Sequence, residues 1–170
     1  MVNTDLTTAG ALTINADSNN NGAGTFSIAP AQTVNSTGNA ISVTAADVAL
    51  TGFLNSGAAT TTLQATFNHT IGVGDIVNIG PLGSHFSVSG AELQNITAGD
   101  LTIGGATSGD ITVDAVTAAQ VAGIAGTVTL RAPTAGRTIT FSGGASTFKA
   151  LSAQASDGVS VNTEIGRAHV

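Results

Sequence analysis

Four aspartates are the residues of this sequence best suited to chemistry: Asp75, Asp100, Asp110 and Asp114. Carboxylates gathered on one face of a protein can serve as acid and base in cleaving a polysaccharide. Each of the four, however, lies directly beside a short apolar strand pattern. Aspartate at such a place commonly accepts a hydrogen bond from the backbone of its own turn. We therefore expect turn residues at these positions.

Basic side chains would also have to lie beside the acids to hold an acidic sugar, and before the last residues the chain offers only Arg131, Arg137 and Lys149. Ser84 precedes His85, but adjacency in sequence does not make a nucleophile and base, and no orienting acid is evident. The sequence thus predicts no catalytic residue and no enzymatic activity. A polysaccharide-active β-helix remains an alternative.

Metal binding has two weak signals. His69 in "NHTIG" and His85 in "SHFSV" have no further residue of ligand character at a matched position. The loop "GGATSGD", residues 104–110, is similar to a calcium-binding nonapeptide, but its second glycine pair is displaced and no tandem copy follows. We expect no metal site and no cofactor.

Threonine pairs suggest a third chemistry. Thr127-Val128-Thr129, Thr138-Ile139-Thr140 and Thr60-Thr61-Thr62 resemble the Thr-x-Thr pairs with which some β-solenoids bind ice. Most other strand patterns of the chain carry only one threonine. Ice binding is therefore a second alternative, and β-propensity on a solvated face explains these residues more simply.

The elements that position these residues are short strands. An apolar residue, a small or hydroxyl residue and a second apolar residue recur between Gly, Asn, Asp and Ser turns, and this alternation is typical of a strand with one buried face. The units begin at Leu12, Phe26, Ile41, Val48, Ile71, Val77, Phe86, Leu101, Ile111, Val128, Ile139 and Val159. Such short strands need like neighbours on which to stack.

We predict an all-β fold, a right-handed parallel β-helix (β-solenoid) of about 20–25 residues per coil. The loose connections and the lack of Trp favour it over the alternative, an antiparallel β-sandwich. Its interior should hold the residues that close the apolar units: Ile14, Ile28, Val43, Ile103, Val113, Leu130 and Phe141.

Composition limits the functional classes. Four Lys and Arg against ten Asp and Glu give a net charge of −6, which repels phosphate and makes nucleic-acid binding unfavourable. The chain contains no run of about 18 apolar residues, so its sequence predicts no membrane span. Its first ten residues, "MVNTDLTTAG", have no signal-peptide pattern.

The segments "AELQNITAGDLTIGGATSGDITVDAVTA" and "GALTINADSNNNGAGTFSIAPAQTVNSTGNAISVTAADVALTG" resemble the strand repeats of filamentous-haemagglutinin-like bacterial surface adhesins. The resemblance covers most of residues 5–162. This sequence lacks the Asn-Pro-containing secretion motif of that family. It implies a parallel β-helix and a non-enzymatic, secreted or cell-surface shaft. The implied partners are neighbouring repeats of the same chain and a host or cell-surface glycan or protein.

The last residues differ from the rest. "EIGRAHV" matches the translation of a common sequencing adapter, and it breaks the strand alternation. We therefore expect residues 1–163 to be a solenoid segment from the interior of a longer protein, and residues 164–170 to be a non-native tail. A segment cut in this way should self-associate through its exposed coil edges.

Overall fold

The computed structural model describes residues 1–76 and 85–167, and in these ranges the chain is nearly all β. Every strand pair of the described residues is parallel. The antiparallel β-sandwich is therefore wrong, because its hairpins would pair neighbouring strands in opposite directions. No helix of the described residues is long and apolar enough to cross a membrane.

The strands form three larger sheets and two strand pairs. The six-stranded sheet has the order β17 (Leu151–Ala155), β14 (Val128–Ala132), β12 (Leu101–Gly104), β8 (Thr61–Ala65), β5 (Ile41–Ala45), β2 (Leu12–Asn15). The five-stranded sheet has the order β10 (His85–Val88), β9 (Thr70–Gly74), β13 (Ile111–Asp114), β15 (Ile139–Phe141), β18 (Val159–Val161). The four-stranded sheet joins β1 (Leu6–Thr7), β4 (Thr33–Asn35), β7 (Phe53–Asn55) and β11 (Ile96–Thr97); β3 (Thr25–Ile28) pairs with β6 (Asp47–Leu50), and β16 (Ser146–Phe148) with β19 (Ile165–Arg167).

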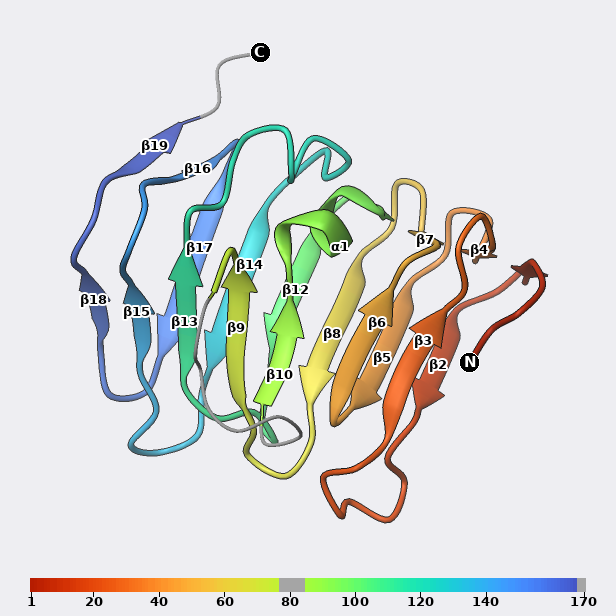
Figure 1. The fold of residues 1–170 in the computed structure, drawn as a ribbon, viewed down its shortest axis with the longest axis horizontal. Coiled ribbons are helices and arrows are strands. Elements are labelled where there is room, and N and C mark those ends of the chain that lie inside the picture. Colours follow the sequence, from red (N-terminus) through yellow and green to blue (C-terminus); the bar gives the residue numbers. More distant parts are fainter. Residues whose placement is uncertain (77–84, 168–170) are drawn as a thin grey trace.

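Successive strands visit these sheets in a repeating order. β7, β8 and β9 pass through the four-, six- and five-stranded sheets, and β11, β12 and β13 then pass through the same sheets beside them. We call one such pass a rung. Figure 1 shows the result as two main layers of strands, with β18 to β3 in front and β17 to β2 behind. The core lies between these layers.

The core confirms most of the predicted interior. Ile28, Val43, Ile103, Val113, Leu130 and Phe141 are fully buried. Ile14 is only half-buried, because β2 is the edge strand of its sheet and no rung covers its outer side. All but one of the apolar units lie in strands; the unit that begins at Val77 lies outside the described residues.

One strand departs from the repeating order. β10 pairs with β9 on the side opposite β13 and also contacts β6, so it lies between β6 and β9 (Figure 1). The short helix α1 (Gly90–Gln94) follows it, capped by Ser89, whose hydroxyl and Glu92 form a capping box. The Glu92 carboxylate also accepts the backbone N–H of Leu50 at 3.0 Å, which ties this insertion to the end of β6.

The C-terminal rung lies at one end of the described stack, where β18 is the edge strand of its sheet. Val159 and Val161 of its strand β18 are 42% and 56% exposed. After it, residues 165–167 form β19 and continue the rung beside β16, with Ile165 half-buried against the core. The expected break in strand pattern is thus absent from these three residues, while the foreign origin of residues 164–170 stays a prediction.

Candidate functional site

The outer face of the six-stranded sheet carries an unbroken column of hydroxyl groups, which we call the hydroxyl face. Each strand contributes one in-register residue: Thr13, Ser42, Thr62, Thr102, Thr129 and Ser152. Beside it runs a second outward column of mostly amide and hydroxyl side chains, which is interrupted at Gly104 of β12: Asn15, Thr44, Gln64, Arg131 and Gln154. Hydroxyls both donate and accept hydrogen bonds, so this surface can bind an uncharged polar partner through many weak contacts.

The threonine pairs do not form a continuous array on this face. Residues 60–62 and 127–129 lie at the starts of β8 and β14, and these two strands lie on either side of β12. At the equivalent position before β12 stands Asp100, whose carbonyl accepts the N–H of Thr61 at 2.9 Å. The third pair, residues 138–140, lies at β15 in the five-stranded sheet. A negative charge therefore interrupts the pairs on the hydroxyl face.

Three of the four aspartates bind the next rung rather than their own turn. Their carboxylates accept backbone N–H groups 27 to 30 residues later: Asp100 from Thr127 (2.7 Å), Asp110 from Thr138 (2.8 Å) and Asp114 from Gly144 (2.6 Å). The positions beside strands are as expected, although Asp114 is the last residue of β13 and not a turn residue. The partners differ from the prediction, because stacking brings an N–H of the following rung close to each carboxylate. These three carboxylates thus link successive rungs by hydrogen bonds.

The basic residues do not gather around the acids. Within residues 1–76 and 85–167 the one ion pair joins Arg137 to Asp110 at 3.6 Å. Lys149 donates to the carbonyl of Ala125, and Arg131 is exposed on the outer face of β14. Asp75 meets Asp114 only through its backbone, its N–H donating to the Asp114 carbonyl at 3.0 Å.

The two histidines lie on adjacent parts of the fold but in different settings. His69 is buried, and its Nδ1 lies 3.1 Å from the carbonyl oxygen of Ala46. His85 begins β10 and is in register with Thr70. The described residues contain no group of three or more His, Cys, Asp or Glu side chains that could hold a metal ion. Ser84 lies outside the described residues.

A second polar feature, unexpected from the sequence, centres on Asp17. Its carboxylate is buried and accepts three hydrogen bonds, from the Thr66 hydroxyl at 2.7 Å and from the N–H groups of Gly22 and Asn21 at 2.9 and 3.2 Å. Thr66 follows β8 and Asp17 follows β2, so the contact passes over the rung between them. That rung turns from β5 to β6 through Ala46 alone, which leaves the longer loops on either side free to meet.

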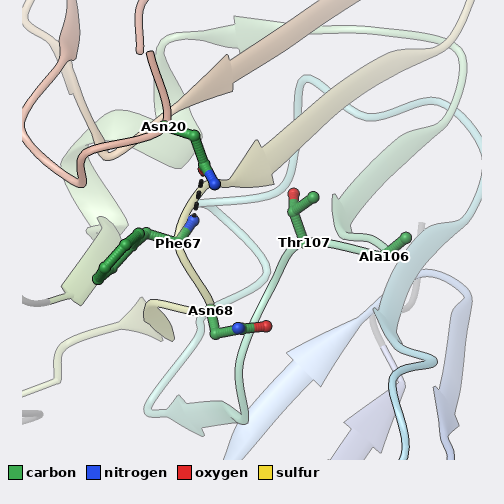
Figure 2. A pocket seen from close by; sticks show the side chains of 5 residues that line it. All are labelled: Asn20, Phe67, Asn68, Ala106 and Thr107. Atoms are coloured by element: carbon green, nitrogen blue, oxygen red, sulfur yellow. Dashed lines mark hydrogen bonds between the residues drawn. The ribbon is translucent and has the colours of Figure 1, made fainter. Parts of the chain in front are cut away.

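These two loops and the loop after β12 border a small hollow at the corner between the layers. Asn20, Phe67, Asn68, Ala106 and Thr107 line it, and its volume is about 200 Å³. Figure 2 shows the Asn20 side chain above Phe67, with Thr107 and Ala106 on one side of Phe67 and the Phe67 ring pointing to the other side. The side-chain amide oxygen of Asn20 accepts the N–H of Phe67 at 3.1 Å.

Replacing Asp17 with asparagine is expected to lower the melting temperature at neutral pH. The N–H₂ group of an asparagine side chain cannot accept a hydrogen bond, so it would face donor groups of the protein whose hydrogen bonds the Asp17 carboxylate accepts. The Thr66 hydroxyl bond lowers the pKa of Asp17, helped by the Gly22 and Asn21 N–H groups and by His69 and opposed by burial. A carboxyl with a lowered folded-state pKa stabilises the fold above its unfolded pKa of about 4, and that stability is lost as pH falls through the folded pKa.

The measurement is thermal unfolding of both proteins by circular dichroism across acidic and neutral pH. The difference between the two melting temperatures should be constant above about pH 5 and shrink below about pH 4. Asp157→Asn, at an exposed position, serves as the matched control and should leave the melting temperature nearly unchanged. A difference of constant size down to the lowest pH would show that the charge of Asp17 contributes nothing.

No family model matches this chain, and the searches of curated proteins and of solved structures found no significant match.

Proposed function

We propose that the chain is a right-handed β-solenoid segment that serves as a non-enzymatic shaft and contact surface of a secreted or cell-surface bacterial protein of adhesin type. Parallel strands that visit the same sheets in the same order support the solenoid, and crossovers between parallel strands are almost always right-handed. Each added rung lengthens such a stack by about 4.8 Å, so repetition gives reach with a simple sequence.

The observation that carries the contact role is the hydroxyl face. Six in-register strands present a hydroxyl at the same outward position, while the adjacent positions of each strand face the core. A regular, weakly charged surface of this kind suits a repetitive polar partner such as a cell-surface glycan. Many weak contacts in parallel can then give firm attachment.

The test attaches the chain to fluorescent beads and measures how many beads remain on cultured epithelial monolayers after washing. Wild-type beads should be retained. Lysines at Thr62 and Thr129, on strands separated by β12, should reduce retention at least about tenfold, because their long charged side chains cover the hydroxyl column. Both side chains point outward, so folding should be preserved.

The control places the same two charges on the other layer, as Thr112→Lys and Ser160→Lys on β13 and β18, which are separated by β15. These beads should be retained like wild type. Wild-type beads that do not bind, or equal losses for both pairs of substitutions, would contradict an adhesive hydroxyl face.

A further inference from the structure

The hollow beside Asp17 is built from three rungs. Asn20 comes from the loop after β2, Phe67 and Asn68 from the loop after β8, and Ala106 and Thr107 from the loop after β12. Two hydrogen bonds fix the middle loop between the others: Asn20 accepts the N–H of Phe67, and the Thr107 carbonyl accepts the N–H of Asn68 at 2.9 Å. The Asp17 carboxylate, with its three bonds, anchors the first loop beneath.

The backbone of this hollow is strained. Asn20, Phe67 and Asn68 have φ angles of 51°, 54° and 55°, in the left-handed region that favours glycine. Among the described residues six non-glycine residues have positive φ, and three of these six line this one hollow. Asparagine tolerates the conformation, but for phenylalanine it is an outlier. Strain of this kind persists where the surrounding structure enforces it, and it concentrates at ligand-binding sites.

The strained backbone displays an aromatic ring to solvent. Phe67 is 58% exposed, whereas Phe26, Phe86, Phe141 and Phe148 are buried. One side of the ring meets His69, with the ring centroids 6.2 Å apart in an edge-to-face arrangement. The rest of the ring stays in solvent at a strained backbone position, where its free face is available to an apolar surface of a ligand.

The chemistry of the hollow is neutral. Its lining offers an aromatic ring, two side-chain amides, a hydroxyl and a methyl group, and no charged side chain. The Thr107 hydroxyl donates to the Ala65 carbonyl at 2.7 Å and accepts a hydrogen bond from the Gln64 side-chain amide, so the fold itself holds it in place. The volume of about 200 Å³ is below the 300–1,000 Å³ of pockets for drug-sized ligands, which fits one small ring.

We propose that this hollow binds one ring of a neutral sugar. The apolar C–H face of the ring stacks on Phe67, and its hydroxyls hydrogen-bond to the amides of Asn20 and Asn68. This site lies at a corner of the fold and not on the hydroxyl face, so it does not depend on the adhesive role. The sugar is a free monosaccharide or a single residue of a longer glycan.

The test is an NMR titration of ¹⁵N-labelled protein with methyl β-glucopyranoside, methyl β-galactopyranoside, methyl α-mannopyranoside and N-acetylglucosamine. At least one should shift the amides of Phe67, Asn68 and Thr107 in a saturable way, with a dissociation constant of about a millimolar. Phe67→Ala should weaken binding about tenfold or more. Phe53→Ala, at the other exposed ring, which is 49% exposed on β7, should bind like wild type.

A second variant separates binding from folding. Phe67→Gly removes the ring and relieves the positive φ, so it should abolish the shifts while keeping or raising the melting temperature. Three results would overturn the proposal: no saturable shift with any of the four sugars, stronger binding of glucuronic acid than of its neutral counterpart, or unchanged binding by Phe67→Gly.

Discussion

Replacing Ile103 with alanine is expected to lower the free energy of unfolding by about 2–5 kcal/mol, because it leaves a cavity in the core. Ile103 is fully buried in β12, in register with Leu63 on one side and Leu130 on the other. The lost methyl groups would have filled space between three successive rungs, and those rungs cannot close the gap without disturbing two strand ladders. Urea unfolding followed by circular dichroism measures the loss.

The matched control is the adjacent residue of the same strand. Thr102 points outward on the hydroxyl face and is half-exposed, so Thr102→Ala should cost less than about 1 kcal/mol. The contrast between the two alanines tests the alternation of inward and outward positions directly. Similar losses for both, or a loss below about 0.5 kcal/mol for Ile103→Ala, would contradict the stacked core.

Most strands of the two main layers could be predicted because they contribute two inward apolar residues each, as Ile111 and Val113 do in β13. The strands β8 and β17 were not predicted, because an inward position holds Thr61 in β8 and the small Ala153 in β17. The four-stranded sheet was not predicted, because its strands lack this pattern. Its strands β4, β7 and β11 each bury a single apolar side chain, Val34, Leu54 and Ile96, so no alternation appears. A period of two cannot be recognised from one residue.

A repeated sequence at the ends of β4 and β7 could have predicted two strands of that sheet. The segments "VNSTGNAISV" and "LNSGAATTTL" repeat the same corner in two successive rungs. Asn35 and Asn55 each accept an N–H two residues later at 2.8 Å, and Ser36 and Ser56 are buried. An alignment of the two Asn-Ser corners would have predicted both strands. In the same way, Ser89 followed by Glu92 is the sequence pattern of a helix N-terminus and marks α1.

The hollow could not be predicted from sequence alone. Asp17 and Thr66 are 49 residues apart, and they meet because the rung between them turns through a single residue. Neither the strand pattern nor any local motif encodes which loops meet across a short corner. The positive φ of Phe67 is likewise imposed by its neighbours and not by its own preference.

Gly104→Ala is expected to destabilise the protein by at least about 3 kcal/mol, through backbone strain and a steric clash together. Gly104 ends β12 with φ of +95°, and a Cβ atom there would lie 2.1 Å from the carbonyl oxygen of Arg131 in the next rung. Gly74 holds the same place at the end of β9, with φ of +94° and a Cβ distance of 2.0 Å to the Asp114 carbonyl oxygen.

The clash can be separated from the strain with Gly38, which has φ of +84° but nothing within 4 Å of its added Cβ. Gly38→Ala should cost only about 1–2 kcal/mol, the conformational term. Both variants are compared with wild type by urea unfolding, and the excess loss in Gly104→Ala measures how closely successive rungs approach. A tightly stacked fold cannot separate two rungs at one point without breaking the ladder hydrogen bonds on either side. Equal losses for the two alanines would mean that the rungs move apart freely, and would contradict the close stacking on which a rigid shaft depends.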